Sequence, residues 1–220
     1  MKILAMTDIH GAYRTAEEIL SSIEGIDVFI IGGDFSLVGT PKEVEDAVRS
    51  WQKYKVPIVA VSGNMDLPEI DGTLETLGIS VNGKGTVIEG VGFFGVSASP
   101  HSPLHTPYEI SENEIARRIQ AGYELVQAAR TNILIPHAPP YRTKVDRIFS
   151  GLHVGSRAVR EFIEREQPSV CVCGHIHEAR GQDTIGQTKV VNCGPARDGY
   201  YALIDLQKTI NIQNKEYQKR

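Results

Sequence analysis

Five short polar clusters in this chain carry side chains that can bind metal ions. Each cluster follows an apolar run, so each stands where a strand is expected to end. Carboxylate, amide and imidazole ligands suit divalent first-row metals, and seven of them can hold two ions with positions left open for a substrate. The seven side chains that make this prediction are Asp8, His10, Asp34, Asn64, His137, His175 and His177.

A pair of divalent metals suits the hydrolysis of a phosphoester. Such a pair lowers the pKa of a bridging water and clamps the phosphoryl oxygens. Asp34 is the natural candidate for a carboxylate that touches both ions. The charge of two divalent ions exceeds that of Asp8, Asp34 and a hydroxide together, so the site stays positive and attracts an anion.

The elements expected in the first third of the chain would bring these clusters together. Apolar runs at residues 2–7, 27–31 and 58–61 predict strands, and the stretch from Ala12 to Ile23 predicts an amphipathic helix. A second helix is expected to begin at Thr40-Pro41, where Glu43 completes a capping box, and to run to about residue 55. Strands joined through helices favour a parallel sheet, and sites lie at the carboxyl edge of such sheets.

The remainder predicts a second set of strands and helices, and two half-sheets packed face to face with helices outside would accommodate the order. A single domain is expected over residues 1–212, with a charged, solvated tail at 213–220. The runs at 86–89 and 92–96 predict a hairpin, and Ser111 and Glu114 cap a helix to about residue 130. Further elements are expected at 132–135, 156–166, 168–173, 188–192, 200–205 and 209–212.

Composition excludes several classes of protein. The 220 residues are 41% apolar and 23% charged, as in an ordinary globular protein. The formal net charge of −4 means that no overall positive potential attracts nucleic acid. No apolar run approaches membrane-spanning length, and we expect no membrane partner. Three cysteines are too few for a disulfide framework, and this favours a cytoplasmic location. Cys171 and Cys173 are expected as buried thiols on one face of a strand.

The ordered motifs resemble those of a known family. Asp-x-His, Gly-Asp, Gly-Asn, His and Gly-His-x-His, from Asp8 to His177, are similar to the calcineurin-like metallophosphoesterases, and residues 136–199 resemble their compact single-domain prokaryotic members. The resemblance implies a four-layer α/β/β/α sandwich of two mixed sheets flanked by helices. It also implies that one metal is bound by Asp8, His10 and His177, the other by Asn64, His137 and His175, and that Asp34 bridges.

From this set we expect direct catalytic roles for Asp34, Asn64 and His175. Imidazole and carboxylate together tolerate manganese, iron, nickel, cobalt and zinc, and manganese is the leading expectation. The sequence does not predict the oligomeric state.

One position departs from the family pattern. The family usually has Gly-Asn-His-Asp/Glu, and this chain has Met65 in place of the histidine that protonates the leaving group. A thioether has no proton to give, and general acid help is worth about 10²–10⁴-fold in rate. Either the substrates have easier leaving groups, or another histidine substitutes. The candidates for contacts with the substrate are Met65, His101, His153 and Arg142, with His105 a weaker candidate.

These observations predict a binuclear metal-dependent phosphodiesterase that hydrolyses small nucleotide-like substrates by attack of metal-bound hydroxide. A phosphomonoesterase or protein phosphatase is the first alternative, and Met65 counts against it because a serine alkoxide leaves poorly without an acid. A non-catalytic metal-binding scaffold is the second alternative. Relatives with that fate usually lose ligands, and every expected ligand is present here.

Overall fold

The first of two large sheets is built around the N-terminal strand. In the computed structural model, which describes residues 1–207 and 209–218, its order is β13-β12-β1-β2-β3. Strands β1, β2 and β3 are parallel, as the helical connections predict, and β12 and β13 are antiparallel additions. The strands are β1 (Lys2–Met6), β2 (Val28–Gly32), β3 (Ile58–Val61), β12 (Tyr200–Leu206) and β13 (Ile210–Glu216).

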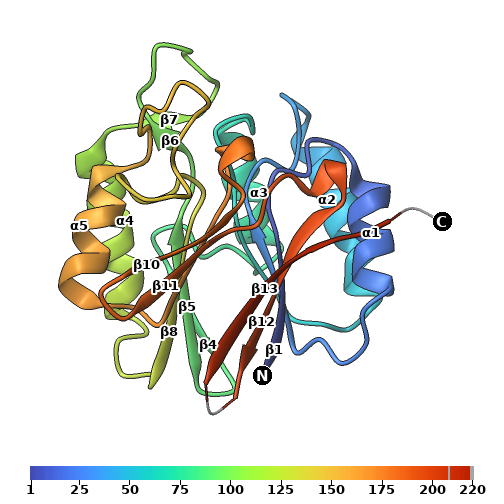
Figure 1. The fold of residues 1–220 in the computed structure, drawn as a ribbon. Helices are drawn as coiled ribbons and strands as arrows, with labels where there is room; N and C mark the ends of the chain where they lie inside the picture. The colour runs from blue at the N-terminus through green and yellow to red at the C-terminus, as the bar shows by residue number, and fades with distance from the viewer. Residues whose placement is uncertain (208, 219–220) are drawn as a thin grey trace.

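The second large sheet has the order β10-β11-β9-β8-β5-β4. Its four central strands are parallel, and each edge is an antiparallel strand. The predicted hairpin is β4 and β5, and a separate short pair, β6 and β7, lies above this sheet (Figure 1). The strands are β4 (Gly85–Ile88), β5 (Val91–Val96), β6 (Ser99–Pro100), β7 (Glu109–Ile110), β8 (Thr131–Pro136), β9 (Val170–Cys173), β10 (Gly181–Ile185) and β11 (Thr188–Asn192).

Helices cover the outer faces of both sheets, which confirms the four-layer α/β/β/α arrangement (Figure 1). On the first sheet lie α1 (Tyr13–Ser21), α2 (Pro41–Gln52) and α3 (Glu69–Thr76), and on the second lie α4 (Glu112–Glu124) and α5 (Arg157–Glu166). Two short 3₁₀ turns, η1 (His177–Ala179) and η2 (Ala196–Asp198), follow strands β9 and β11.

Alternation along the strands separates three apolar cores. In β1, Ile3 and Ala5 face the core between the sheets, whereas Leu4 and Met6 face α1 and α2. In β9, the two valines face the other sheet and both cysteines face α4 and α5. Cys171 and Cys173 are therefore free, buried thiols on one strand face, as predicted.

Helix boundaries follow the local signals at their starts better than at their ends. Thr40 accepts a hydrogen bond from the Glu43 backbone and Glu43 returns one, so the predicted capping box is present. The helix expected to reach residue 130 ends at Glu124 instead. The chain then tightens into turns that place Val126 against Gly92 of β5. The helix therefore ends where the chain packs onto the hairpin, and the helical period of the sequence does not predict that contact.

The predicted tail needs correction. Strand β13 continues to Glu216, which pairs with Tyr200, so residues 213–216 belong to the first sheet and are not solvated tail. A hydrogen bond also joins this strand to the second sheet, because Asn214 Nδ2 donates to the carbonyl of Asn192 in β11 at 2.9 Å. Residues 219–220 of the predicted tail lie outside the described residues.

Short elements escaped prediction. Helix α3 has eight residues, includes Gly72 and buries only Ile70 and Leu74, so its helical period is weak. Strand β10 is polar and half-exposed at a sheet edge, where packing imposes little pattern. Among the described residues, no helix is both long enough and apolar enough to cross a bilayer.

Candidate metal centre

The segments that follow β1 and β2 stay paired beyond the ends of their strands. The Asp8 amide donates to the Gly33 carbonyl at 2.9 Å, and the His10 amide donates to the Asp34 carbonyl at 2.9 Å. This pairing holds the loop after β1 alongside the loop after β2. It places Asp8 and His10 directly beside Asp34 at the carboxyl edge of the first sheet.

Four of the seven candidate ligands have left-handed backbone. The φ angles of Asp8, His10, Asp34 and His175 are 55°, 47°, 53° and 67°. A non-glycine residue there costs about 1–3 kcal/mol and persists only where its surroundings impose it. Among the described residues, eleven non-glycine residues have positive φ, and four of these are predicted ligands, which is the clustering expected near a functional site.

One group of donor atoms comes from Asp8, His10 and His177. Their ligand atoms lie within 4.8 Å of one another. His177 Nε2 lies 3.3 Å from Asp8 Oδ1 and 3.2 Å from His10 Nε2. Two imidazole nitrogens and a carboxylate oxygen that converge in this way suit a divalent transition metal.

A second group surrounds the amide oxygen of Asn64. Oδ1 of Asn64 lies 2.9 Å from His137 Nε2 and 2.7 Å from His175 Nδ1. The other ring nitrogen of His137, Nδ1, lies 2.8 Å from the Gly32 carbonyl, which can only accept. His137 therefore donates from Nδ1, and this contact fixes the ring so that Nε2 faces Asn64.

Asp34 lies between the two groups. Its Oδ2 is 3.7 Å from His10 Nε2 and 3.4 Å from His137 Nε2, so one oxygen faces a member of each group. The other oxygen accepts a hydrogen bond from the Met65 amide at 2.8 Å. Asp34, Asp8 and His137 also form a second set with ligand atoms within 4.8 Å. The donor set and its spacing fit two divalent ions with a carboxylate between them.

Two motif glycines are required by the close approach of ligand side chains. A Cβ at Gly63 would lie 2.1 Å from Asp34 Oδ1, and a Cβ at Gly174 would lie 2.2 Å from Asp8 Oδ2. Any side chain at either position would displace a candidate ligand. The glycines of Gly-Asn and Gly-His-x-His therefore serve the site by leaving room for carboxylates supplied by other segments.

The buried charges of the site perturb one another. Burial alone would raise the pKa of Asp8, but the hydrogen bond from His177 and the charge of His137 hold that pKa well below its usual range. Burial lowers the pKa of His175 to about 4, so this ring is neutral at pH 7. Burial opposes protonation of His137 as well, but the Asp34 carboxylate outweighs it and raises the pKa to about 9. Binding of a metal at His137 must therefore release a proton.

Asp66 joins two ligand segments, a role that the motif pattern did not predict. Its buried carboxylate accepts hydrogen bonds from the backbone amides of Phe35 (3.1 Å), Ser36 (2.9 Å) and Gly63 (2.9 Å). These amides belong to the residues beside Asp34 and Asn64. Burial, and then the nearby Asp34 charge, raise the pKa of Asp66 to about 7, although the amides favour the ionised form.

We expect Asp66→Ala to lower the free energy of unfolding by about 3 kcal/mol or more, because three buried amides would lose their acceptor. Urea denaturation in the presence of a chelator measures this without a contribution from metal binding. Asp46→Ala, at an exposed carboxylate of α2, is the matched control and should change stability by less than about 0.5 kcal/mol. Equal stability of the two variants would contradict the role given to Asp66.

Two further polar residues, one buried and one half-buried, hold ligand segments. Asn192 Nδ2 donates to the Ile176 carbonyl at 2.8 Å, inside the Gly-His-x-His motif. Asp71 accepts from Ser62 Oγ at 2.6 Å and from the Tyr108 hydroxyl at 2.7 Å, at the end of β3 that leads to Asn64. The sequence around Asp71 does not predict these hydrogen bonds, because the partners come from other segments of the chain.

The candidate substrate residues are not gathered as closely as the ligands. His101 is exposed, with Nδ1 3.8 Å from Glu109, and His153 Nδ1 lies 2.7 Å from the buried Asp146 of its own loop. The Arg142 guanidinium stacks over Tyr141 and lines a hollow on the α5 side. Of the predicted set, Met65 alone makes a direct contact with a candidate ligand, through its amide.

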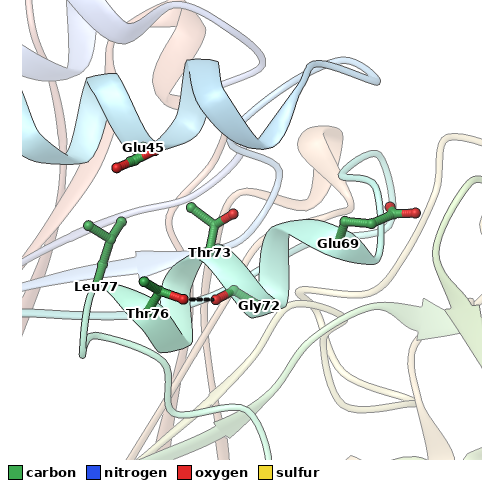
Figure 2. A pocket seen from close by; sticks show the side chains of 6 residues that line it. All are labelled: Glu45, Glu69, Gly72, Thr73, Thr76 and Leu77. Atoms are coloured by element: carbon green, nitrogen blue, oxygen red, sulfur yellow. Dashed lines mark hydrogen bonds between the residues drawn. The ribbon is translucent and has the colours of Figure 1, made fainter.

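A hollow of about 290 Å³ between α2 and α3 is separate from the metal centre (Figure 2). Glu45 and Glu69 contribute carboxylates to its lining, and the Thr76 hydroxyl there is bound to the Gly72 carbonyl. None of the seven candidate ligands lines it. A hollow lined by two carboxylates disfavours a phosphate anion.

The geometry agrees with a comparison against known families. The family model for calcineurin-like phosphoesterases matches residues 1–179. The chain belongs to the calcineurin-like phosphoesterase family. This calcineurin-like phosphoesterase is 33% identical to an uncharacterized protein of Methanocaldococcus jannaschii, over 96% of this chain and 95% of that protein. It is 28% identical to a UPF0046 protein of Caenorhabditis elegans, over 90% of this chain and 71% of that protein.

Solved structures share the fold of this calcineurin-like phosphoesterase. A Thermus thermophilus protein superposes with a TM-score of 0.77 at 20% identity, with 98% of each chain covered. A dimetal phosphatase from Danio rerio superposes with a TM-score of 0.67 at 11% identity, over 98% of this chain and 96% of that one. Family membership makes this chain a metal-dependent phosphoesterase, and the structure supplies candidate ligands for the metals.

Proposed function

We propose that this protein is a binuclear metal-dependent phosphodiesterase that hydrolyses small nucleotide-like diesters. The observation that supports the proposal is the meeting of all seven candidate ligands at one edge of the two sheets, with Asp34 between the two groups. We place the enzyme in the cytoplasm, where its three free, buried cysteines need no oxidising compartment.

We assign Asp8, His10 and His177 to one metal, and Asn64, His137 and His175 to the other, with Asp34 shared. Manganese is the expected metal. When bound, two divalent ions lower the pKa of a water and neutralise the charge of the phosphoryl group. The protein's own part is to hold this arrangement rigid. The Gly32 carbonyl orients His137, and the His175 amide donates to both oxygens of Asp8 at 3.1 and 3.2 Å.

Preference for diesters is proposed from the leaving group. Met65 stands where the family has an acid, and its side chain offers no proton. The histidines that remain as candidate acids, such as His101 and His153, lie on loops and outside the seven candidate ligands. An alkyl monoester depends strongly on protonation of its leaving oxygen, whereas a diester with a good leaving group depends on it less. We assign Arg142, His101 and His153 to weaker contacts with the substrate.

An activity panel tests the proposal. Cyclic nucleotides, aryl diesters and monoesters are compared in Mn²⁺, with the metal-free protein as control. We expect turnover of diesters to exceed that of monoesters and to vanish without metal. Higher turnover of monoesters would support a phosphomonoesterase, and no turnover by fully metal-loaded protein would support a scaffold.

The assignment of ligands also makes a prediction about metal content. His175→Ala should lose about one of the two metals while the other site retains more, because the two histidines of the final motif face different groups. His177→Ala should lose the other. Elemental analysis after dialysis measures both, and His105→Ala, an exposed loop histidine, should retain both metals. Unchanged metal content in both ligand variants would refute the assignment.

A further inference from the structure

Three loops at the edge that carries the candidate centre expose apolar side chains. The loops are residues 36–39, 101–107 and 142–154, and all rise from the same end of the molecule (Figure 1). Phe149 is 93% exposed, Leu104 81% and Leu152 64%. Large apolar side chains that are this exposed, on loops at one end of a molecule, mark a candidate surface of interaction. We call this surface the apolar rim, and its apolar members are Leu37, Val38, Leu104, Phe149, Leu152 and Val154.

Each loop of the apolar rim is tied to a segment that carries a candidate ligand. The Val38 amide donates to the Met65 carbonyl at 3.0 Å, and the Tyr108 amide, at the end of the second loop, donates to the Asn64 carbonyl at 3.0 Å. The Phe149 amide lies 3.3 Å from the Glu178 carboxylate, one residue after His177. The rim is therefore built onto the centre, and a surface that covers the rim also faces the metals.

The charge of the apolar rim differs from that of the whole chain. The chain has a net charge of −4. The three loops expose no carboxylate among their described residues, because their single acidic residue, Asp146, is fully buried. They expose three permanent cations, Arg142, Lys144 and Arg147, and three histidines, His101, His105 and His153. Of the carboxylates that contact these loops, Glu178 is exposed, Asp183 is half-buried and Glu109 is largely buried. The rim therefore combines apolar groups with an excess of exposed cations, which together favour an anionic, apolar partner.

We propose that the apolar rim docks on the surface of an anionic phospholipid bilayer. Five of its six apolar side chains are aliphatic, and aliphatic groups enter a lipid interface but give no stacking platform for nucleobases. A second copy of the same face is disfavoured, because cationic loops would oppose cationic loops. Anionic headgroups complement the cations, and the interface region accepts Phe149, Leu104 and Leu152.

Docking adds a further substrate class, which rests on the proposed phosphodiesterase activity. A docked enzyme would face its centre toward phosphodiesters carried on the lipid surface. Small nucleotide-like diesters would remain substrates of the undocked enzyme. The sequence-based expectation of no membrane partner rested on the lack of a long apolar run, and docking at an interface does not depend on such a run. Three exposed loops bind at an interface without any spanning segment.

Co-sedimentation with vesicles tests docking without reference to activity. The full-length, metal-loaded chain is mixed with vesicles of phosphatidylglycerol and phosphatidylcholine, or of phosphatidylcholine alone. We expect binding to the anionic vesicles, with a decrease of at least about tenfold in the partition coefficient of Phe149→Ser/Leu152→Ser. Lys144→Gln should weaken binding about fivefold. The matched control is Val87→Ser/Leu125→Ser, at exposed apolar residues outside the rim, which should bind as wild type does.

The outcomes separate docking from catalysis. Phe149→Ser/Leu152→Ser should hydrolyse a water-soluble aryl diester like wild type, so loss of vesicle binding without loss of hydrolysis bears on docking alone. Absence of hydrolysis in both proteins bears on the proposed function alone. Absence of binding to anionic vesicles, or equal binding by the rim variant, would overturn docking. Two other results would also overturn docking if the protein does not bind vesicles. One is a dimer in sedimentation velocity, and the other is binding to a single-stranded oligonucleotide. If Phe149→Ser/Leu152→Ser abolishes either interaction, the rim belongs to that partner.

Discussion

An Asp34→Asn variant is expected to be nearly inert. The carboxylate has one oxygen facing both groups of ligands, so a neutral amide would weaken both metal sites at once. We expect kcat/KM for an aryl diester to fall by at least about 10³-fold, more than the loss of one charge-stabilising donor costs. Chelation of the wild type should abolish activity, and added Mn²⁺ should restore it.

The measurement pairs turnover with metal content for each protein. Asp46→Asn, at an exposed carboxylate of α2, is the matched control and should keep wild-type activity and metal. Thermal unfolding of both variants establishes that each is folded. Near-normal turnover by Asp34→Asn with both metals bound would show that Asp34 does not act between them.

A Met65→His variant is expected to gain activity toward alkyl monoesters relative to aryl diesters. The substitution places an imidazole where the family has one, beside the candidate ligand Asn64. General acid help is worth about 10²–10⁴-fold, and an aryl oxide needs it least, so the ratio of the two activities should shift toward that range. The gain falls short of the full effect if the neighbours do not orient the new ring.

This experiment compares kcat/KM for one alkyl monoester and one aryl diester at matched metal content. Met65→Gln is the control, because it fills similar space without supplying a proton at neutral pH. If the histidine and glutamine variants give the same ratio, Met65 does not set the leaving-group preference. The acid would then have to come from His101, His105 or His153, each of which can be replaced by alanine in turn.

Much of the fold follows from local patterns. The strand at 58–61 and the capping box at Thr40 lie where the sequence predicts them, because an apolar run and a cap are properties of neighbouring residues. The alternation of side chains along a strand put Cys171 and Cys173 on one face of β9. Elements whose limits depend on distant packing were less predictable. The end of α4 at Glu124 and the extension of β13 to Glu216 are of this kind.

The identities of the candidate ligands were likewise available from the sequence. Residue type, order and position after apolar runs are all local, and they single out the seven side chains that the structure brings together at one edge. Met65 was also visible as a departure, since a missing proton donor is a fact of chemistry and needs no coordinates.

Tertiary structure alone decided how these side chains are held and what surrounds them. The left-handed backbone of Asp8 and Asp34 depends on pairing between two loops, and Asp66 gains its role from amides that are remote in sequence. Exposure of Phe149 and burial of Asp146, three residues apart in one loop, likewise depend on which segments fold over them. The physical reason is that ligand type is a property of a residue, whereas geometry, burial and electrostatic field are properties of all the segments that meet there.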